Sequence, residues 1–153
     1  MKDTTSVLRL SNADAGRVSA VGLFRLAHDR AREQMVERIH QAGHPDFTPA
    51  MIGLFRFASM DGRRPGEIAA TARLSKQATN NLLGQLERIG YLDRRPDTSD
   101  GRGRVVRLTE RGRALDATVI DSGRKVETSY RRRIGSQRWA LFKEILSELI
   151  EQT

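Results

Sequence analysis

The segment that decides the fold is LSKQATNNLLGQLERIGYLDRRPDTSDGRGRVVRLT, residues 74–109. Its first half has apolar residues at helical spacing, with Ser75 suited to cap a helix and Gly90 suited to end it. Residues 91–95 and 104–108 have the composition of short strands, and the residues between them are mostly turn formers. The segment therefore predicts a helix followed by a β-hairpin.

The outward face of this predicted helix has an unusual composition. The residues that we expect to face inward are Ala78, Leu82, Leu86 and Ile89, with Leu83 beside them. The residues that we expect to face outward are Lys76, Gln77, Thr79, Asn80 and Asn81. Exposed helix faces are usually rich in Glu and Lys, and Asn and Thr are poorer helix formers. Asn and Gln can form two hydrogen bonds with adenine in the major groove of DNA, so this face predicts base contacts; the alternative is a polar face that only meets solvent.

The loop between the two strands is basic. Arg102 lies between two glycines, which leave its backbone uncrowded, and Arg95 and Arg104 flank the loop. An arginine at a hairpin tip can enter the minor groove of DNA, where the negative potential is concentrated. We expect Asp97 and Asp100 to stabilise the turn. The alternative is a flexible, solvated hairpin tip. A helix for the major groove followed by a basic hairpin is the layout of a winged helix-turn-helix.

Composition supports a polyanionic partner. The chain has 153 residues, enough for one domain with its own core, and a net charge of +8. Residues 60–113 carry 12 Lys and Arg against 7 Asp and Glu, so most of the excess charge lies around the predicted winged unit. The chain has no cysteine, which excludes disulfides, thiolate metal sites and cysteine nucleophiles. Without a signal peptide or an apolar run of membrane-spanning length, we expect a soluble cytoplasmic protein with no membrane contact.

Long helices are predicted on both sides of the central unit. Apolar periodicity predicts helices over residues 17–41, 49–59, 66–72, 109–133 and 137–152, so the fold class is mainly α with a small β-hairpin wing. We expect a flexible N-terminal arm over residues 1–16 and a single domain over residues 17–153. Within that domain, the winged helix-turn-helix covers about 46–110, and dimerisation helices cover about 17–42 and 110–151. The first helix would exceed about 30 Å, a length that usually needs a partner such as a second subunit.

The sequence contains no catalytic or metal-binding pattern. His28, His40 and His44 lack a third good ligand at a defined spacing, so structural roles are expected for them, with a ligand pocket as the alternative for His28. The sequence contains no nucleophile–histidine–acid pattern and no glycine-rich phosphate loop. We therefore predict neither an enzyme nor a cofactor or metal site.

Three segments carry a family resemblance: DGRGRVVRLT at 100–109 followed by Gly112, LERIGYL at 86–92 followed by Arg94, and EIA at 67–69. They resemble, in that order, the wing signature, the end of the recognition helix and part of the second helix of the MarR family of bacterial transcriptional regulators. The resemblance covers residues 17 to about 150. It implies a homodimer with interlocked terminal helices that reads a palindromic operator on double-stranded DNA.

The resemblance also implies site residues. The predicted DNA-contacting set is Ser75, Lys76, Gln77, Thr79, Asn80, Asn81, Arg95, Asp100, Arg102 and Arg104. Arg102 matches the wing-tip arginine of the family and Asp100 the aspartate that braces it. The chain departs from the family at Asn80 and Asn81, where a basic residue is common, and at residues 65–66, where Pro and Gly replace a Ser/Thr cap. These departures bear on the operator sequence and not on the fold.

Many members of the family bind small aromatic ligands between the dimerisation helices and the winged unit. Candidates for lining such a pocket are Phe24, His28, Phe55, Phe57 and Trp139, with plain core packing as the alternative for each. The sequence therefore predicts a sequence-specific DNA-binding transcriptional regulator, a homodimeric repressor controlled by a small-molecule ligand. Two other classes are weighed against it: a winged-helix module that binds only proteins, and an enzyme built in the dimer cleft.

Overall fold

The structure, a computed structural model, describes residues 17–55, 59–98 and 103–151. The predicted N-terminal arm lies outside these residues. The elements in chain order are α2 (Ala20–Gln41), the 3₁₀ helix η1 (Pro49–Phe55), α3 (Pro65–Ala72), α4 (Lys76–Arg88), β1 (Leu92–Pro96), β2 (Arg104–Leu108), α5 (Glu110–Ile134) and α6 (Ser136–Glu151). The prediction of a mainly helical chain with one small hairpin is confirmed. No helix within the described ranges is both long and apolar enough to cross a membrane.

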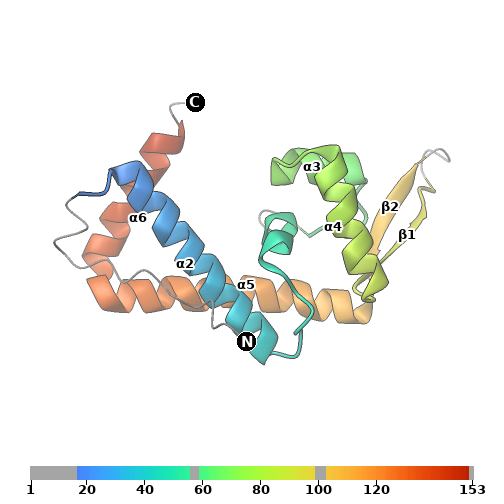
Figure 1. Ribbon diagram of the computed structural model, residues 1–153, viewed down its shortest axis with the longest axis horizontal. Coiled ribbons are helices and arrows are strands. Elements are labelled where there is room, and N and C mark those ends of the chain that lie inside the picture. Colours follow the sequence, from blue (N-terminus) through green and yellow to red (C-terminus); the bar gives the residue numbers. More distant parts are fainter. Residues whose placement is uncertain (1–16, 56–58, 99–102, 152–153) are drawn as a thin grey trace.

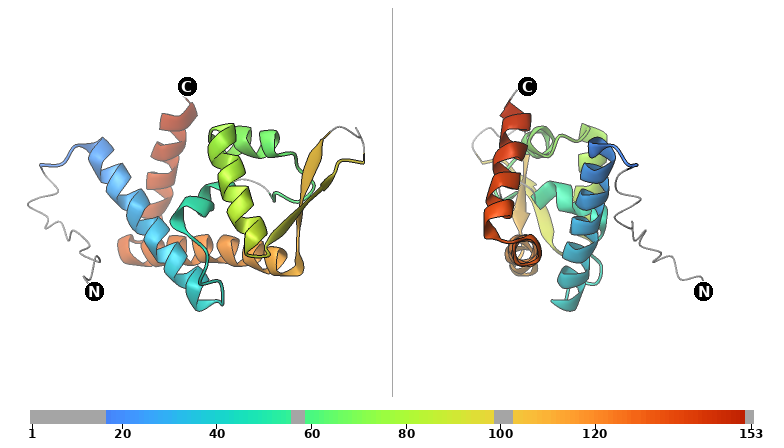
Figure 2. Two further views of the ribbon diagram at one scale, coloured as in Figure 1. Left: turned by 45° about the vertical axis from the view of Figure 1, so that its right-hand side comes forward. Right: turned by 90° about the vertical axis from the view of Figure 1, so that its left-hand side faces the viewer.

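The molecule has two ends that α5 connects (Figures 1 and 2). One end holds α3, α4 and the hairpin. The other end holds α6, the first turns of α2 and the last turns of α5. Helix α5 runs along the molecule beneath both ends, and α2 crosses it. The winged unit and the terminal helices are therefore separate parts of one continuous scaffold.

Local signals set the boundaries of α4. The Ser75 hydroxyl accepts a hydrogen bond of 3.0 Å from the backbone N–H of Ala78, as an N-cap residue does. At the other end, Gly90 has a φ of 79°, a left-handed conformation that favours glycine. The buried stripe of α4 consists of Thr79, Leu83 and Leu86. Leu86 is inward as predicted, and Leu82 and Ile89 are partly buried against the core, but Thr79 and Leu83 replace Ala78 and Leu82 as fully buried residues.

The hairpin is attached to the turn before α3. Strands β1 and β2 pair antiparallel, from Leu92 opposite Leu108 to Pro96 opposite Arg104. Two further backbone hydrogen bonds join Val106 to the segment before α3: Gly62 N–H donates to Val106 O at 2.8 Å, and Val106 N–H donates to Arg63 O at 2.9 Å. The base of the wing is therefore held from two sides.

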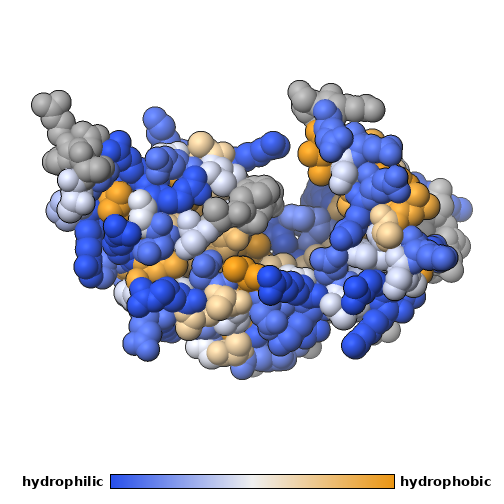
Figure 3. Space-filling model, turned by 180° about the vertical axis from the view of Figure 1, so that it is seen from behind, coloured by the Kyte–Doolittle hydropathy of each residue, from blue (hydrophilic) through white to orange (hydrophobic). Residues whose placement is uncertain are grey.

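The core lies where the winged unit meets α5 and the end of α2. Its fully buried side chains include Ile39, Met51, Leu83 and Leu115. Helix α6 differs, because none of its described residues is buried. The apolar residues exposed at this end are Val21, Leu23, Phe24, Leu26, Leu141, Ile145, Leu149 and Ile150. Figure 3 shows orange patches on its right, at the end opposite the winged unit.

A buried polar cluster joins α2, β1 and α5. The His44 ring is buried, and its Nδ1 lies 3.0 Å from the hydroxyl of Tyr91, which is fully buried. The Arg111 guanidinium lies over the Tyr91 ring, 4.3 Å from its centroid. Burial lowers the pKa of His44 below its ordinary value of 6.5, and the charge of Arg111 lowers it further. The fold therefore favours the neutral imidazole.

Gly112 in the first turn of α5 has no room for a side chain. A Cβ at this position would lie 1.9 Å from the backbone oxygen of Tyr91. We expect Gly112→Ala to lower the free energy of unfolding by about 3 kcal/mol or more, because the contact is with backbone that cannot rotate away. Gly84→Ala is the matched control: its Cβ would lie 3.7 Å from the nearest atom, so we expect a gain of about 0.5–1 kcal/mol. Urea denaturation measures both changes, and equal effects would contradict the packing described.

The pKa of His44 predicts a pH dependence of stability. Because this pKa is lower in the folded than in the unfolded chain, unfolding takes up a proton between the two values. The stabilisation is complete above about pH 6.5 and is lost as the pH falls through the pKa of the folded state. We expect the urea concentration at the unfolding midpoint to decrease as the pH is lowered from about 7 to about 5. His44→Gln should reduce the slope of this pH dependence. An unaltered slope in His44→Gln would refute the assignment.

Candidate nucleic-acid interface

The outer face of α4 presents most of the predicted base-reading residues together. Lys76, Gln77, Asn80 and Asn81 are all exposed, and Ser75 is exposed at the N-terminus of the helix. Thr79 is the exception, since its side chain is fully buried. The prediction that Thr79 faces outward is therefore wrong: the threonine packs inward with Leu83 and Leu86. Its hydroxyl is buried without a hydrogen-bond partner in the described part of the chain.

The side-chain amide of Asn80 is held in one orientation. Its Nδ2 donates to the backbone oxygen of Lys76 at 3.0 Å, and its Oδ1 accepts from Nη1 of Arg94 at 3.4 Å. A flipped amide would place Oδ1 against a carbonyl and Nδ2 against a cation, so these two partners define its sense. A primary amide has two donors and two acceptor positions. One donor and one acceptor therefore remain, the pair that a two-bond contact with adenine requires.

Arg94 on β1 connects the wing to α4. Its Nη2 donates to the backbone oxygen of Asn80 at 3.1 Å, and its Nε lies 3.4 Å from Oε2 of Glu87. Its backbone N–H donates to Oε1 of the same Glu87 at 3.2 Å. The guanidinium also passes close to Gly84, which leaves room for it. The sequence indicates Arg94 only through the likeness to the family motif at 86–94, because nothing in the sequence places β1 against the middle of α4.

The base of the wing loop is braced by Asp97. This carboxylate is buried and accepts from Nε and Nη2 of Arg64, at 2.8 and 2.7 Å. The Asp97 N–H donates to Gly103 O at 2.8 Å, which closes the loop. The prediction that Asp97 stabilises the turn is confirmed. Asp100 and Arg102 lie outside the described residues.

Several arginines surround the base of the wing. Arg95 and Arg104 are exposed, and Arg95 contacts Asp93 at 3.4 Å. Arg95 lines a polar cavity of about 920 Å³ together with Arg64 and Arg107, between the hairpin and the start of α3. Glu67 and Asp97 also line this cavity, and Arg64 and Arg107 pair with Asp97 and Asp61. The exposed Arg95 and Arg104 are therefore the cations of this region that best suit a phosphate backbone.

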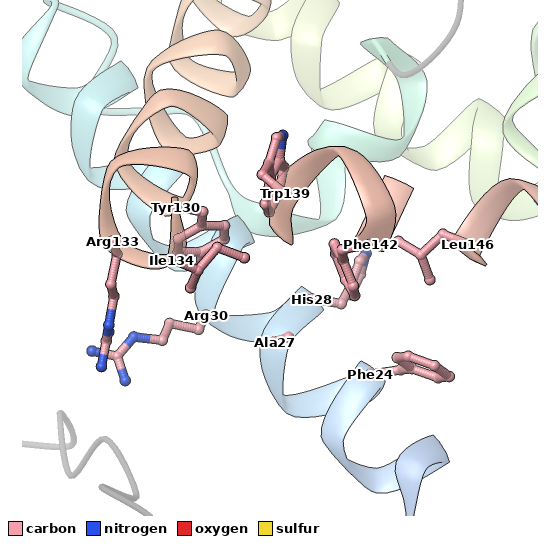
Figure 4. A pocket seen from close by; sticks show the side chains of 10 residues that line it. All are labelled: Phe24, Ala27, His28, Arg30, Tyr130, Arg133, Ile134, Trp139, Phe142 and Leu146. Carbon is pink, nitrogen blue, oxygen red and sulfur yellow. The ribbon is translucent and has the colours of Figure 1, made fainter. Parts of the chain in front are cut away.

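The predicted ligand-lining residues fall in two cavities. Phe24, His28 and Trp139 line an apolar cavity of about 510 Å³ between α2, α5 and α6. Arg30 and Arg133 also line this cavity, and in the view of Figure 4 both side chains extend away from Phe24 and Phe142. Phe57 lies outside the described residues.

The second cavity, of about 530 Å³, lies between α2, η1 and α5. His28 and Phe55 line it, so His28 is shared by both cavities. Phe55 is also a member of the core, which was the alternative considered for it. Arg32 and Arg124 are the cations of this cavity, and its other walls are mainly apolar.

Comparison with known proteins agrees with this geometry. A sequence profile of the MarR family matches residues 46–103. The HTH-type transcriptional repressor Rv2887 of Mycobacterium tuberculosis is 30% identical over 101 residues, which cover 66% of this chain and 73% of that protein. The structure of Rv2887 in complex with salicylic acid has a TM-score of 0.64 at 26% identity, covering 88% of this chain and 98% of that one.

The fold is also that of the transcriptional repressor CouR, solved bound to a 23-mer DNA duplex. The TM-score is 0.71 at 22% identity, and the match covers 92% of this chain and 98% of CouR. The profile covers the winged unit, and the structural matches extend the likeness to the terminal helices. The chain therefore belongs to the MarR family of winged helix-turn-helix transcriptional regulators.

Proposed function

We propose that the chain is a homodimeric repressor, and not an enzyme, which reads a palindromic operator through α4 and is controlled by a small molecule. The observation that carries the proposal is the exposed polar face of α4, fixed to a basic hairpin beside it. It acts in the cytoplasm with the bacterial chromosome, as a single domain of residues 17–153. CouR, a relative in fold, has been solved on DNA.

The residues of α4 and those of the wing have different roles on DNA. Lys76, Gln77, Asn80 and Asn81 enter the major groove, where amides discriminate between bases. Arg95, Arg102 and Arg104 contact the backbone or the minor groove, where contacts position the protein and add affinity on any sequence. Asp100 braces the wing tip. Ser75 caps α4, which also directs the first N–H groups of the helix toward a phosphate.

The homodimer explains the surface of the terminal helices. Helix α6 and the start of α2 expose eight large apolar side chains, and no residue in the described part of α6 is buried, as expected of a surface that a partner covers. A second copy packed on it buries this face and places two α4 helices on one side of the dimer. Such dimers bind half-sites about one helical turn apart, 34–36 Å between centres.

The cavity between α2, η1 and α5 is the proposed effector site. It lies where the winged unit meets the long helices, so an occupant changes the contact between them. Its apolar walls and two arginines suit a small aromatic acid. The relative Rv2887 has been solved with salicylic acid, which makes salicylate a suitable probe.

Selection from random DNA duplexes tests operator reading. We expect inverted half-sites with centres about 10 base pairs apart. Asn80→Ala should change base preference at one half-site position by about 1–3 kcal/mol. Arg102→Ala should weaken binding to all duplexes and lower the salt slope by about one phosphate-equivalent. Thr79→Val, a buried change, is the control that should alter neither quantity. The proposal would be contradicted if the selection enriched no common sequence, or if Arg102→Ala kept the wild-type affinity and salt slope.

Titration with salicylate tests the effector site. We expect salicylate to change operator affinity, and Arg124→Met to raise the concentration needed by about tenfold, because a charge-assisted hydrogen bond contributes about 1.5–3 kcal/mol. Arg133→Met, in the other cavity, is the matched control and should respond as wild type. A loss of response in Arg133→Met alone would move the effector site to the cavity between α2, α5 and α6.

A further inference from the structure

We propose that Arg94 is a positioning residue for sequence recognition: it sets the orientation of Asn80 without contacting DNA. The inference rests on the proposed function, because it concerns how that interface discriminates between bases. Arg94 belongs to the wing, yet its guanidinium lies on the recognition helix.

The guanidinium of Arg94 is committed to the protein. Nη1 and Nη2 donate to the side chain and the backbone of Asn80, and Nε faces Glu87. The side chain is 19% exposed, against 67% for its neighbour Arg95. A phosphate would therefore have to displace at least one of these contacts to reach Arg94. Arg95, on the same strand, is accessible to phosphate without such a loss.

The two contacts with Asn80 act together on its amide. The hydrogen bond to the Asn80 carbonyl holds the guanidinium against α4, and Nη1 then meets Oδ1 from a fixed position. Lys76 O holds the other end of the amide. With both ends held, the remaining donor and acceptor are already arranged before DNA arrives, and less side-chain entropy is lost on binding.

Gly84 is part of the same arrangement. A Cβ there would lie 3.7 Å from Nη2 of Arg94, in ordinary contact, so alanine is accommodated while a larger side chain would compete for the space of the guanidinium. Glu87 completes it one helical turn further on, where its carboxylate pairs with both the N–H and the Nε of Arg94. Asn80, Gly84 and Glu87, on one side of α4, thus form the binding site for the Arg94 side chain of the wing.

A double-mutant cycle separates this role from a structural one. The measurement is the ratio of affinities for the selected operator and for a duplex changed at the single position that Asn80→Ala affects. We expect Arg94→Met, which keeps the apolar stem, to reduce this ratio by about threefold or more. In an Asn80→Ala background, Arg94→Met should leave the ratio unchanged. Arg94→Lys keeps the charge but cannot bind both Oδ1 and the backbone oxygen of Asn80. Compared with Arg94→Met, it should recover more of the operator affinity than of the affinity ratio.

Arg95→Met is the matched control from the same strand. It should lower affinity for both duplexes equally and leave the ratio as in wild type. Arg94→Met behaving like Arg95→Met, or reducing the ratio equally with and without Asn80, would overturn the inference while leaving operator reading intact. A wild-type protein with no base preference at all would instead overturn the proposed function, and this inference with it.

Discussion

The close approach of α5 to the start of the hairpin is the contact on which the rest of the structure depends. Only a glycine at position 112 allows it, because the Tyr91 carbonyl occupies the place of a side chain. Thr109 closes the contact from both sides: its N–H donates to Tyr91 O, and its hydroxyl donates to Gly90 O. The end of α4, the root of the wing and the beginning of α5 therefore meet at one point. The buried pair of His44 and Tyr91 adds the end of α2 to this junction.

The local signals in the sequence predicted the elements well because their causes are local. Ser75 and Thr109 cap helices, as side-chain oxygens followed by free N–H groups do in any fold. The second strand of the hairpin has the predicted bounds. The first strand begins one residue later than predicted, because Tyr91 is buried in the core. Residues 49–55 are helical as predicted, although as a 3₁₀ helix. Here the predictions needed only neighbouring residues.

The predictions that failed or were missed depend on distant packing. The sequence predicted an outward Thr79 because threonine is polar. In the folded chain, however, Thr79 and Leu83 are buried inside the winged unit. The link from Arg94 to Asn80 joins residues that only the folded hairpin brings together. The candidate ligand residues divide between two cavities that share His28: Phe24 and Trp139 line the cavity beside α6, and Phe55 lines the cavity beside η1. Spacing along a helix indicates which residues share a face, and it does not indicate what packs on that face.

The length of α5 has a mechanical consequence. Its 25 residues form one uninterrupted helix, about 37 Å long, from the root of the wing to the far end of the molecule. A rod of this length amplifies small angles: a tilt of about 5° displaces its end by about 3 Å, close to the 3.4 Å rise of one base-pair step. A slight change of angle at the α6 end is therefore enough to move the wing out of register with a DNA groove, without any change inside the winged unit itself.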